Sequence, residues 1–254
     1  MNLQQLEYIV AVDKFRHFAQ AARSCGVAQS TLSALIQKLE AELGLSIFDR
    51  RKHKVYPTEA GAEIIAQAKM ALYHAAQIEG IAESHRNGPS GRVRLGITHT
   101  AASCIVPGLF SYMSQRYPDI DISIDIADDK SLAERVRLTE TDMAILTLPI
   151  EDESLEEIPI YKEQLIIYSS GTDRGREWKH VSGSIDDLIR IVDANGGYAR
   201  IPESYTRYLT DNQKKNIRQD DLKRYIEVGM VIRRDFMMDS LVHILTDAVK
   251  SIMK

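Results

Sequence analysis

A short segment at residues 87–91 constrains the fold of this 254-residue chain more than any other feature. Its sequence, Asn-Gly-Pro-Ser-Gly, combines the residues that most often form turns and linkers. Before it, apolar residues recur at helical spacing, whereas after it strand-like stretches alternate with helical ones. The chain length also suits two domains of ordinary size. We therefore expect two structural parts joined near this segment.

The first part has the pattern of a small helical domain that ends in a β-hairpin. Three helices are expected, at residues 3–12, 18–25 and 28–44, and Gly44 ends the last of them. In this third helix, Leu32, Ile36, Leu39 and Leu43 fall on one face and leave a polar face opposite. Residues 45–58 alternate in character around a basic turn, which predicts two short strands with their tip near Lys52 and His53.

Residues 59–86 contain no proline and predict one long helix, which Thr58 can cap. Five members of its apolar stripe are candidates for dimerisation: Ile64, Ala68, Leu72, Ala75 and Ile78. A long amphipathic helix attached to a small domain needs a partner for such a stripe. This stripe could either pack against its own domain or pair with a second copy of the chain. We favour pairing because residues 1–58 have a small core of their own.

After the linker the elements follow the order strand, helix, strand, helix, strand. The strands are expected at 92–97, 120–126 and 143–148, and the helices at 100–116 and 131–138. This order implies a parallel sheet with helices on both faces, an α/β fold. Further along, we expect a strand at 159–169, a loop at 170–184, helices at 185–194 and 203–211, a strand at 225–232 and a terminal helix at 235–253.

Charge is unevenly distributed along the chain. Residues 1–58 contain eight Lys or Arg and five Asp or Glu, a formal charge of +3. The whole chain carries −4, so the remainder carries −7. Half of the basic residues in the first part fall within residues 50–54. A basic end on an acidic body fits an anionic partner that binds locally at that end.

Several other function classes find little support in the sequence. There is no apolar run long enough to cross a membrane and no secretory pattern at the N-terminus, so we expect a cytoplasmic protein. Cys25 and Cys104 are too few for a disulfide framework, and the seven histidines lack metal-ligand spacing. No nucleophile–base pair or paired carboxylates stand out. We therefore expect no metal, no cofactor and no enzymatic activity.

The first 65 residues resemble the LysR-type transcriptional regulators. The motifs that carry the resemblance are the opening LQQLEYIVAV, then FAQAA, VAQSTLS, IQKLEAELGLSIFDR and PTEAG. Weaker likeness continues through RYPD at 116–119, DMAIL at 142–146 and IPESY at 201–205. The resemblance covers most of the chain, and residues 170–184 have no counterpart in it.

This resemblance implies three parts with defined boundaries. They are a winged helix-turn-helix DNA-binding domain at 1–58, a linker and dimerisation helix at 59–88, and a periplasmic-binding-protein-like effector domain at 89–254. Within the last, subdomain I would comprise about 92–165 and 226–254, and subdomain II about 166–225. Ser30 and Ala34 depart from the proline and arginine common in the family. The stretch between Tyr168 and Pro202 is also short, which implies a reduced subdomain II.

Nine residues are candidate DNA contacts: Gln29, Ser30, Thr31, Ser33 and Lys38 on the third helix, and Arg50, Arg51, Lys52 and Lys54 at the hairpin tip. Short donors and acceptors at the N-terminal end of a helix suit base edges in the major groove. A basic tip suits the phosphate backbone or the minor groove. The alternative is an ordinary solvated face and a solvated charged turn. The resemblance favours DNA contact for the set as a whole.

Six residues are candidate effector contacts: Thr98, His99, Thr100, Ala101, Thr147 and Tyr198. The first four form a turn from a strand into a helix, where amides and hydroxyls suit an anion or a carboxylate. Thr147 ends a neighbouring strand at the same edge of the sheet. Alternatively, the two threonines of the turn only cap the helix. Because subdomain II is reduced, we expect the pocket to be shallow, open or filled by side chains such as Tyr198.

Cys104 raises a redox hypothesis, because one branch of the family senses peroxide. Its position inside the expected helix at 100–116 favours a small core residue instead. The leading hypothesis is thus a bacterial regulator that binds a partly palindromic duplex as a homodimer or homotetramer and responds to a small molecule. Contact with RNA polymerase is left open. The alternative is a regulator whose shortened C-terminal domain serves oligomerisation or protein contacts, and a transport or storage binding protein is less supported.

Overall fold

The computed structural model of the chain describes residues 1–49, 55–171, 175–178 and 184–254. The chain forms two compact units, Met1–Glu79 and Gly80–Lys254. The first unit therefore extends beyond residue 58, where the sequence placed the end of the DNA-binding domain. None of the helices in these described ranges is long and apolar enough to cross a membrane.

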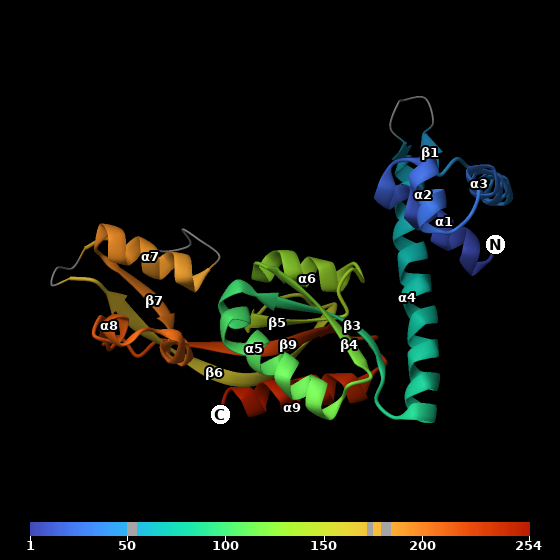
Figure 1. Cartoon of the computed structure of the whole chain (residues 1–254). Helices are drawn as coiled ribbons and strands as arrows, with labels where there is room; N and C mark the ends of the chain where they lie inside the picture. The colour runs from blue at the N-terminus through green and yellow to red at the C-terminus, as the bar shows by residue number, and fades with distance from the viewer. Residues whose placement is uncertain (50–54, 172–174, 179–183) are drawn as a thin grey trace. The chain divides into compact units, whose positions relative to one another are not determined.

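Three helices and a short hairpin make up most of the first unit (Figure 1). The helices are α1 (Leu3–Phe15), α2 (Phe18–Ser24) and α3 (Gln29–Leu43), and the strands are β1 (Phe48–Asp49) and β2 (Tyr56–Pro57). Asn2 starts α1 by accepting a hydrogen bond from the amide of Gln5, whose side chain accepts one from the Asn2 amide. Gly44 ends α3 in the left-handed conformation, at φ 72°. The three predicted helices and the hairpin are confirmed.

The long predicted helix is also confirmed, as α4 (Glu59–Asn87). Its first half is part of the first unit's core, because Ile65 and Ala68 are buried there and Leu72 packs partly against it. Thr58 caps the helix by accepting a hydrogen bond from the amide of Gly61 at 2.9 Å. Gly61 lies so close to the backbone carbonyl of Ile47 that a Cβ atom there would clash. The hairpin and α4 can therefore approach only because this position is glycine.

A mixed sheet forms the framework of the second unit. Its main path runs β4 (Ile120–Ala127), β3 (Gly91–Thr98), β5 (Met143–Leu148), β9 (Tyr225–Arg233), β6 (Leu155–Ser169) and β7 (Tyr198–Pro202), and β8 (Ile217–Arg218) pairs with β6. The first three strands are parallel, as predicted. β9, however, is antiparallel to both β5 and β6, so the sheet as a whole is not parallel.

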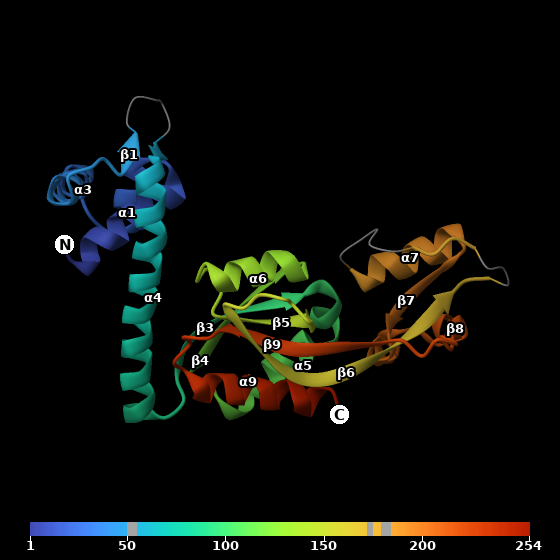
Figure 2. The ribbon, with the colours of Figure 1, turned by 180° about the vertical axis from the view of Figure 1, so that it is seen from behind.

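Helices cover both faces of the first half of this sheet. Figures 1 and 2 show α6 (Asp129–Arg137) on one face, and α5 (His99–Arg116) and α9 (Asp239–Ile252) on the other. Thr98 caps α5, and Asp128 caps α6 by accepting a hydrogen bond from the Ser131 amide at 2.9 Å. These helices and the strands they cover, residues 91–163 and 226–254, are called the first lobe.

A smaller second lobe, residues 164–225, lies at the far end of β6. It contains α7 (Ile185–Asn195), β7, β8, a 3₁₀ turn η1 (Glu203–Tyr208) and α8 (Asp211–Lys214). Its core includes Ile166, Ile189, Val192 and Ile201, all at most 2% exposed. The helix predicted at 203–211 is wrong, because these residues form η1 and the start of the separate short helix α8. The second lobe is small but has a core of its own.

Candidate functional site

Helix α3 presents the polar face that the sequence predicted. Gln29, Ser30, Thr31 and Lys38 are exposed, and Ser33 is half-buried. On the opposite face Leu32, Ile36 and Leu39 are fully buried in the core of the unit. The apolar face fixes the helix in place, and the polar face remains available to a partner.

The N-terminus of α3 differs from those of the helices around it. Asn2 caps α1, His17 caps α2 and Thr58 caps α4, each with a side-chain acceptor. Ala28 precedes α3 and provides no such acceptor. The first amides of a helix lack partners inside the helix, so those of α3 can donate hydrogen bonds to an anion such as a DNA phosphate. This exposed, uncapped end is suited to contact with DNA phosphates.

The candidates Arg50, Arg51, Lys52 and Lys54 lie outside the described residues. The two strands that flank them do pair, with Phe48 opposite Pro57 and Asp49 opposite Tyr56 in antiparallel register. Residues 50–54 therefore connect the two strands of a hairpin, as the sequence indicated. The +3 charge of residues 1–58 includes the four basic residues of this connection.

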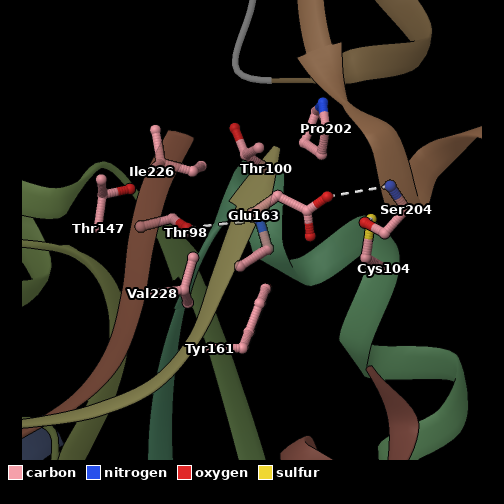
Figure 3. Close-up of a pocket in the computed structure, with 11 residues that line it drawn as sticks. Thr98, Thr100, Cys104, Thr147, Tyr161, Glu163, Pro202, Ser204, Ile226 and Val228 are labelled. Carbon is pink, nitrogen blue, oxygen red and sulfur yellow. Dashed lines mark hydrogen bonds between the residues drawn. The ribbon is translucent and has the colours of Figure 1, made fainter. Parts of the chain in front are cut away.

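A cavity in the second unit brings together four of the six candidate effector residues, Thr98, Thr100, Ala101 and Thr147 (Figure 3). His99 is exposed and does not line the cavity. Tyr198 does not line it either: it is at the opposite end of β7 from the lining residue Pro202, and its hydroxyl donates to Glu177 at 3.4 Å. The expectation that Tyr198 fills the pocket is thus wrong.

The cavity is completed by residues that the sequence did not suggest as effector contacts: Cys104, Tyr161, Glu163, Pro202, Ser204, Ile226 and Val228. Tyr161 is paired with Val228, and Glu163 with Ile226, on the adjacent strands β6 and β9. Side chains two positions apart on a strand point to the same face, so both pairs face the cavity. Pro202 and Ser204 come from the second lobe. The cavity is therefore a cleft between the two lobes, with β6 and β9 across it.

Thr98 caps α5 and also lines the cleft, and its contact with an effector stays a prediction. Its hydroxyl oxygen accepts a hydrogen bond from the Ala101 amide at 3.4 Å, which caps α5. It also lines the cleft at the carboxyl end of β3. Thr147 reaches the same edge from β5, and its amide donates to Asp129 at 2.8 Å. Carboxyl ends of parallel strands are the usual ligand-binding edge of an α/β sheet.

Glu163 is the charged group of the cleft. The residue is 6% exposed, and its Oε1 accepts a hydrogen bond from the Ser204 amide at 3.0 Å. The sequence offers one signal that was missed: Glu163 stands among apolar residues in a strand, where a buried carboxylate is uncommon. Burial, and next the charge of Glu163, raise the pKa of the Tyr161 phenol well above its ordinary value.

Cys104 is a buried thiol on α5. It is 2% exposed, and the Ser204 hydroxyl donates a hydrogen bond to its sulfur at 3.3 Å. Burial raises the pKa of this thiol, and the negative charge of Glu163 acts in the same direction. A reactive cysteine needs a lowered pKa and an electropositive, accessible setting. The environment of Cys104 therefore favours a small core residue over a redox centre.

The cleft is largely filled by its own side chains. The space around it, open solvent at its mouth included, is about 260 Å³, and a water-sized molecule fits within only about 10 Å³ of this. That is about what one water molecule needs, whereas pockets for drug-sized ligands measure roughly 300–1,000 Å³. A ligand of that size would require the two lobes to separate.

Two models of one family match the chain in sequence order. The model described as "Bacterial regulatory helix-turn-helix protein, lysR family" matches residues 3–62. The model described as "LysR substrate binding domain" matches residues 86–173. These ranges contain α3, the Thr98–Ala101 turn and the strands β3, β4 and β5, whereas most of α4 lies between them.

Known proteins give the same assignment. The DNA-binding transcriptional dual regulator OxyR of Escherichia coli K12 is 32% identical over 167 residues, which cover 66% of this chain and 55% of the relative. The chain thus spans little more than half the length of this curated relative. A full-length OxyR variant from Pseudomonas aeruginosa has the same fold, with a TM-score of 0.75 and 22% identity over 98% of both chains.

A further solved structure is the LysR family regulator CbnR in complex with its target DNA. It aligns with a TM-score of 0.64 and 16% identity, covering 99% of this chain and all of the CbnR chain. The likeness extends over both units of the fold. The two matched family models, together with the relative at 32% identity, show that the chain belongs to the LysR-type transcriptional regulators, a family that binds operator DNA through the helix-turn-helix and is not enzymatic.

Proposed function

We propose that this LysR-type regulator responds to a small molecule that binds in the cleft between the two lobes of its second unit. The observation that carries the proposal is the convergence of Thr98, Thr100 and Thr147 with groups from the crossing strands and the second lobe. Polar groups that converge from both lobes on a partly apolar cavity have the usual character of a ligand site.

A ligand in this cleft would act on the contacts that hold the lobes together. The Tyr208 hydroxyl donates to the Cys104 carbonyl at 3.4 Å, and the Arg207 guanidinium donates to the Ile252 carbonyl at 3.5 Å. Ser204 contributes two more contacts, through its hydroxyl to Cys104 and through its amide to Glu163. A molecule that binds one arrangement of the lobes better than the other shifts the balance between them.

On the DNA side, we infer that the regulator is a homodimer or a homotetramer that binds a partly palindromic operator. A two-fold symmetric dimer presents two reading helices α3 to two related half-sites. The second half of α4 is the proposed dimer surface, because Ile78 is 69% exposed there and Ala75 is half-buried. Since its target is the bacterial chromosome, the protein would act in the cytoplasm, with RNA polymerase as a further partner.

Thermal-shift measurements on the full chain test ligand sensing. A panel of small acids, amines and neutral compounds should contain at least one that raises the melting temperature saturably. The shift should disappear in Thr100→Val, which keeps the shape of the side chain and removes its hydroxyl. Ser103→Ala on the same helix lies outside the cleft and should leave the shift unchanged. A shift that persists in Thr100→Val would mean that the ligand binds elsewhere.

A second function is favoured by the small space left in the cleft. In this alternative the C-terminal unit serves oligomerisation or contact with another protein, and no effector enters. It would be supported if no compound in the panel stabilised the chain while operator binding stayed intact. Peroxide, which one branch of the family senses, is not our proposed effector, because Cys104 is buried and the pKa of its thiol is raised.

A further inference from the structure

We propose that the cleft selects a small cation that donates N–H hydrogen bonds, an ammonium ion or a short primary amine, rather than a carboxylate or another anion. The proposal rests on the ligand-sensing function above and names its ligand class. It is carried by the Glu163 carboxylate in the wall of the cleft (Figure 3).

Glu163 has an unused hydrogen-bonding capacity. Its Oε1 accepts from the Ser204 amide at 3.0 Å, and within the described parts of the chain no group donates to its Oε2. The residue is nonetheless 6% exposed, so little bulk water reaches it. Burying a charge is costly unless the charge is paired and hydrogen-bonded. A cationic donor placed in the cleft would supply the missing partner.

The other groups that line the cleft supply no positive charge. They are hydroxyls, a thiol, a phenol and apolar side chains. Arg207 is close by on η1, yet its Nε donates to the Ser204 carbonyl at 2.9 Å and its Nη1 to the Ile252 carbonyl. The guanidinium is therefore engaged with backbone oxygens instead of with Glu163. The hydroxyl oxygens of Thr100 and Thr147 can accept further hydrogen bonds from an ammonium group.

The cleft is electrostatically unfavourable for an anion. The N-terminus of α5 would attract one, but it carries the equivalent of only about half a positive charge. One of the amides at this terminus, that of Ala101, already donates a hydrogen bond to the Thr98 hydroxyl oxygen. Glu163 adds a full negative charge in the same cavity. The protein's own carboxylate thus outweighs the helix terminus, which the sequence alone had suggested as a site for a carboxylate ligand.

The size of the cleft limits the class of ligand further. The 10 Å³ that admits a water-sized molecule suits an ammonium ion, which is close to water in size. Each added methylene group requires more separation of the lobes and more broken contacts between η1 and α5. Affinity should therefore be highest for the smallest cations that can still reach Glu163.

The test measures binding to the full chain by titration calorimetry and thermal shift. The probes are ammonium, methylammonium and ethylammonium chloride, with sodium acetate and acetamide as anionic and neutral counterparts, all at one ionic strength. We expect a saturable rise in melting temperature with the amines and none with acetate. Glu163→Gln keeps an acceptor for the Ser204 amide but loses the charge, and it should weaken amine binding at least tenfold. Glu156→Gln, an exposed glutamate on the same strand, should have no effect.

Two results would overturn the proposal. One is amine binding that is absent or equally strong in Glu163→Gln. The other is saturable stabilisation by acetate. If acetate binding is lost in Thr100→Val, ligand sensing in the cleft stands and only the selectivity for cations is refuted. If no probe and no other compound stabilises the chain, the cleft is not a sensor and both proposals fail.

Discussion

The Tyr168 side chain is a hydrogen-bonding centre inside the second lobe. It is fully buried, and its hydroxyl donates to Asp193 at 2.6 Å while it accepts from the Asn216 side chain at 3.3 Å. One side chain thereby ties β6 to α7 and to the segment before β8. Burial and the hydrogen bond to Asp193 raise the pKa of Tyr168 from its ordinary value of 10 to about 12.

This shift predicts a loss of stability at high pH. The unfolded tyrosine releases its proton near pH 10, whereas the folded one retains it to about pH 12. The contribution is therefore fully present below pH 10 and is lost as the pH rises toward 12, by roughly 2–3 kcal/mol. Urea unfolding of the wild type between pH 9 and pH 12 should show this decline. In Tyr168→Phe the decline should be smaller, and an identical decline in both proteins would contradict the shift.

At the DNA surface, Gln29 is the residue best placed for a specific contact. It is the first residue of α3, it is exposed, and its side chain can both donate and accept. If it contacts one base pair in bidentate fashion, Gln29→Ala should cost about 1–3 kcal/mol and relax the preference at that position. Competition binding on a duplex recovered by genomic pulldown, with each base pair varied in turn, measures this. Gln4→Ala, on the exposed side of α1, is the control, and unchanged preference in Gln29→Ala would remove this residue from base readout.

Candidate site residues differ in how well the sequence could locate them. Thr98, Thr100 and Thr147 follow from a general rule, because carboxyl ends of parallel strands meet at one edge. Glu163 and Ser204 do not, because they reach the cleft only through the antiparallel pairing of β6 with β9 and the return of the chain through η1. Tyr198 was misplaced for the same reason. Its strand β7 was not anticipated, so the sequence could not show which residues of the second lobe face the cleft.

At the scale of elements, the two halves of the apolar stripe of α4 differ in burial. Ala68 is buried in the core of the first unit, and Ile64 and Leu72 pack partly against it. These residues are thus already used within the unit, whereas Ile78 has no such role and is 69% exposed. Packing against its own domain, one of the two alternatives weighed from the sequence, therefore applies to the first half of the helix, and pairing with a second copy stays a prediction for the second half. The half that begins near Ala75 is the one available to a second copy.

Replacing Ile78 with Glu tests this assignment. A charge placed in an apolar seam between two helices loses hydration without gaining a partner, so the dimer should dissociate. Sedimentation velocity should show a shift from dimer to monomer, while the melting temperature changes little because Ile78 lies outside the core. Gln67→Glu adds the same charge at another exposed position of the helix and should leave the dimer intact. A dimeric Ile78→Glu protein would place the interface elsewhere.

Elements with a strong local pattern could be predicted, and those fixed by long-range pairing could not. α3 and α5 have apolar periodicity, and β4 has isoleucine at alternate positions, so each is specified locally. β8 has two residues and β7 five, and both exist because β6 offers an edge to pair with. The direction of β9 likewise depends on its neighbours in the sheet. Local propensity carries little information about such strands.

For the molecule as a whole, residues 1–58 and the remainder of the chain carry net charges of opposite sign. The total of −4 lowers attraction to nucleic acid in general, while the +3 of residues 1–58 concentrates it at one end. Non-specific affinity should therefore depend on a few cations at the hairpin connection and at α3. The negative charge on the remainder of the chain repels phosphate, and this repulsion lowers the affinity for arbitrary DNA sequences.

The salt dependence of DNA binding is the measurement that tests this division. Log K falls as log salt concentration rises, and each phosphate neutralised in B-DNA makes this slope more negative by roughly 0.9. If Arg50 and Arg51 each contact one phosphate, their joint replacement by Ala should make the slope less negative by about 2 and weaken binding to every duplex. The matched control replaces Arg190 and Lys250, two exposed cations of the second unit, with Ala. It removes the same charge but no DNA contact, so its slope should stay that of the wild type. Equal slopes in both double variants would mean that net charge, and not the hairpin connection, sets the affinity.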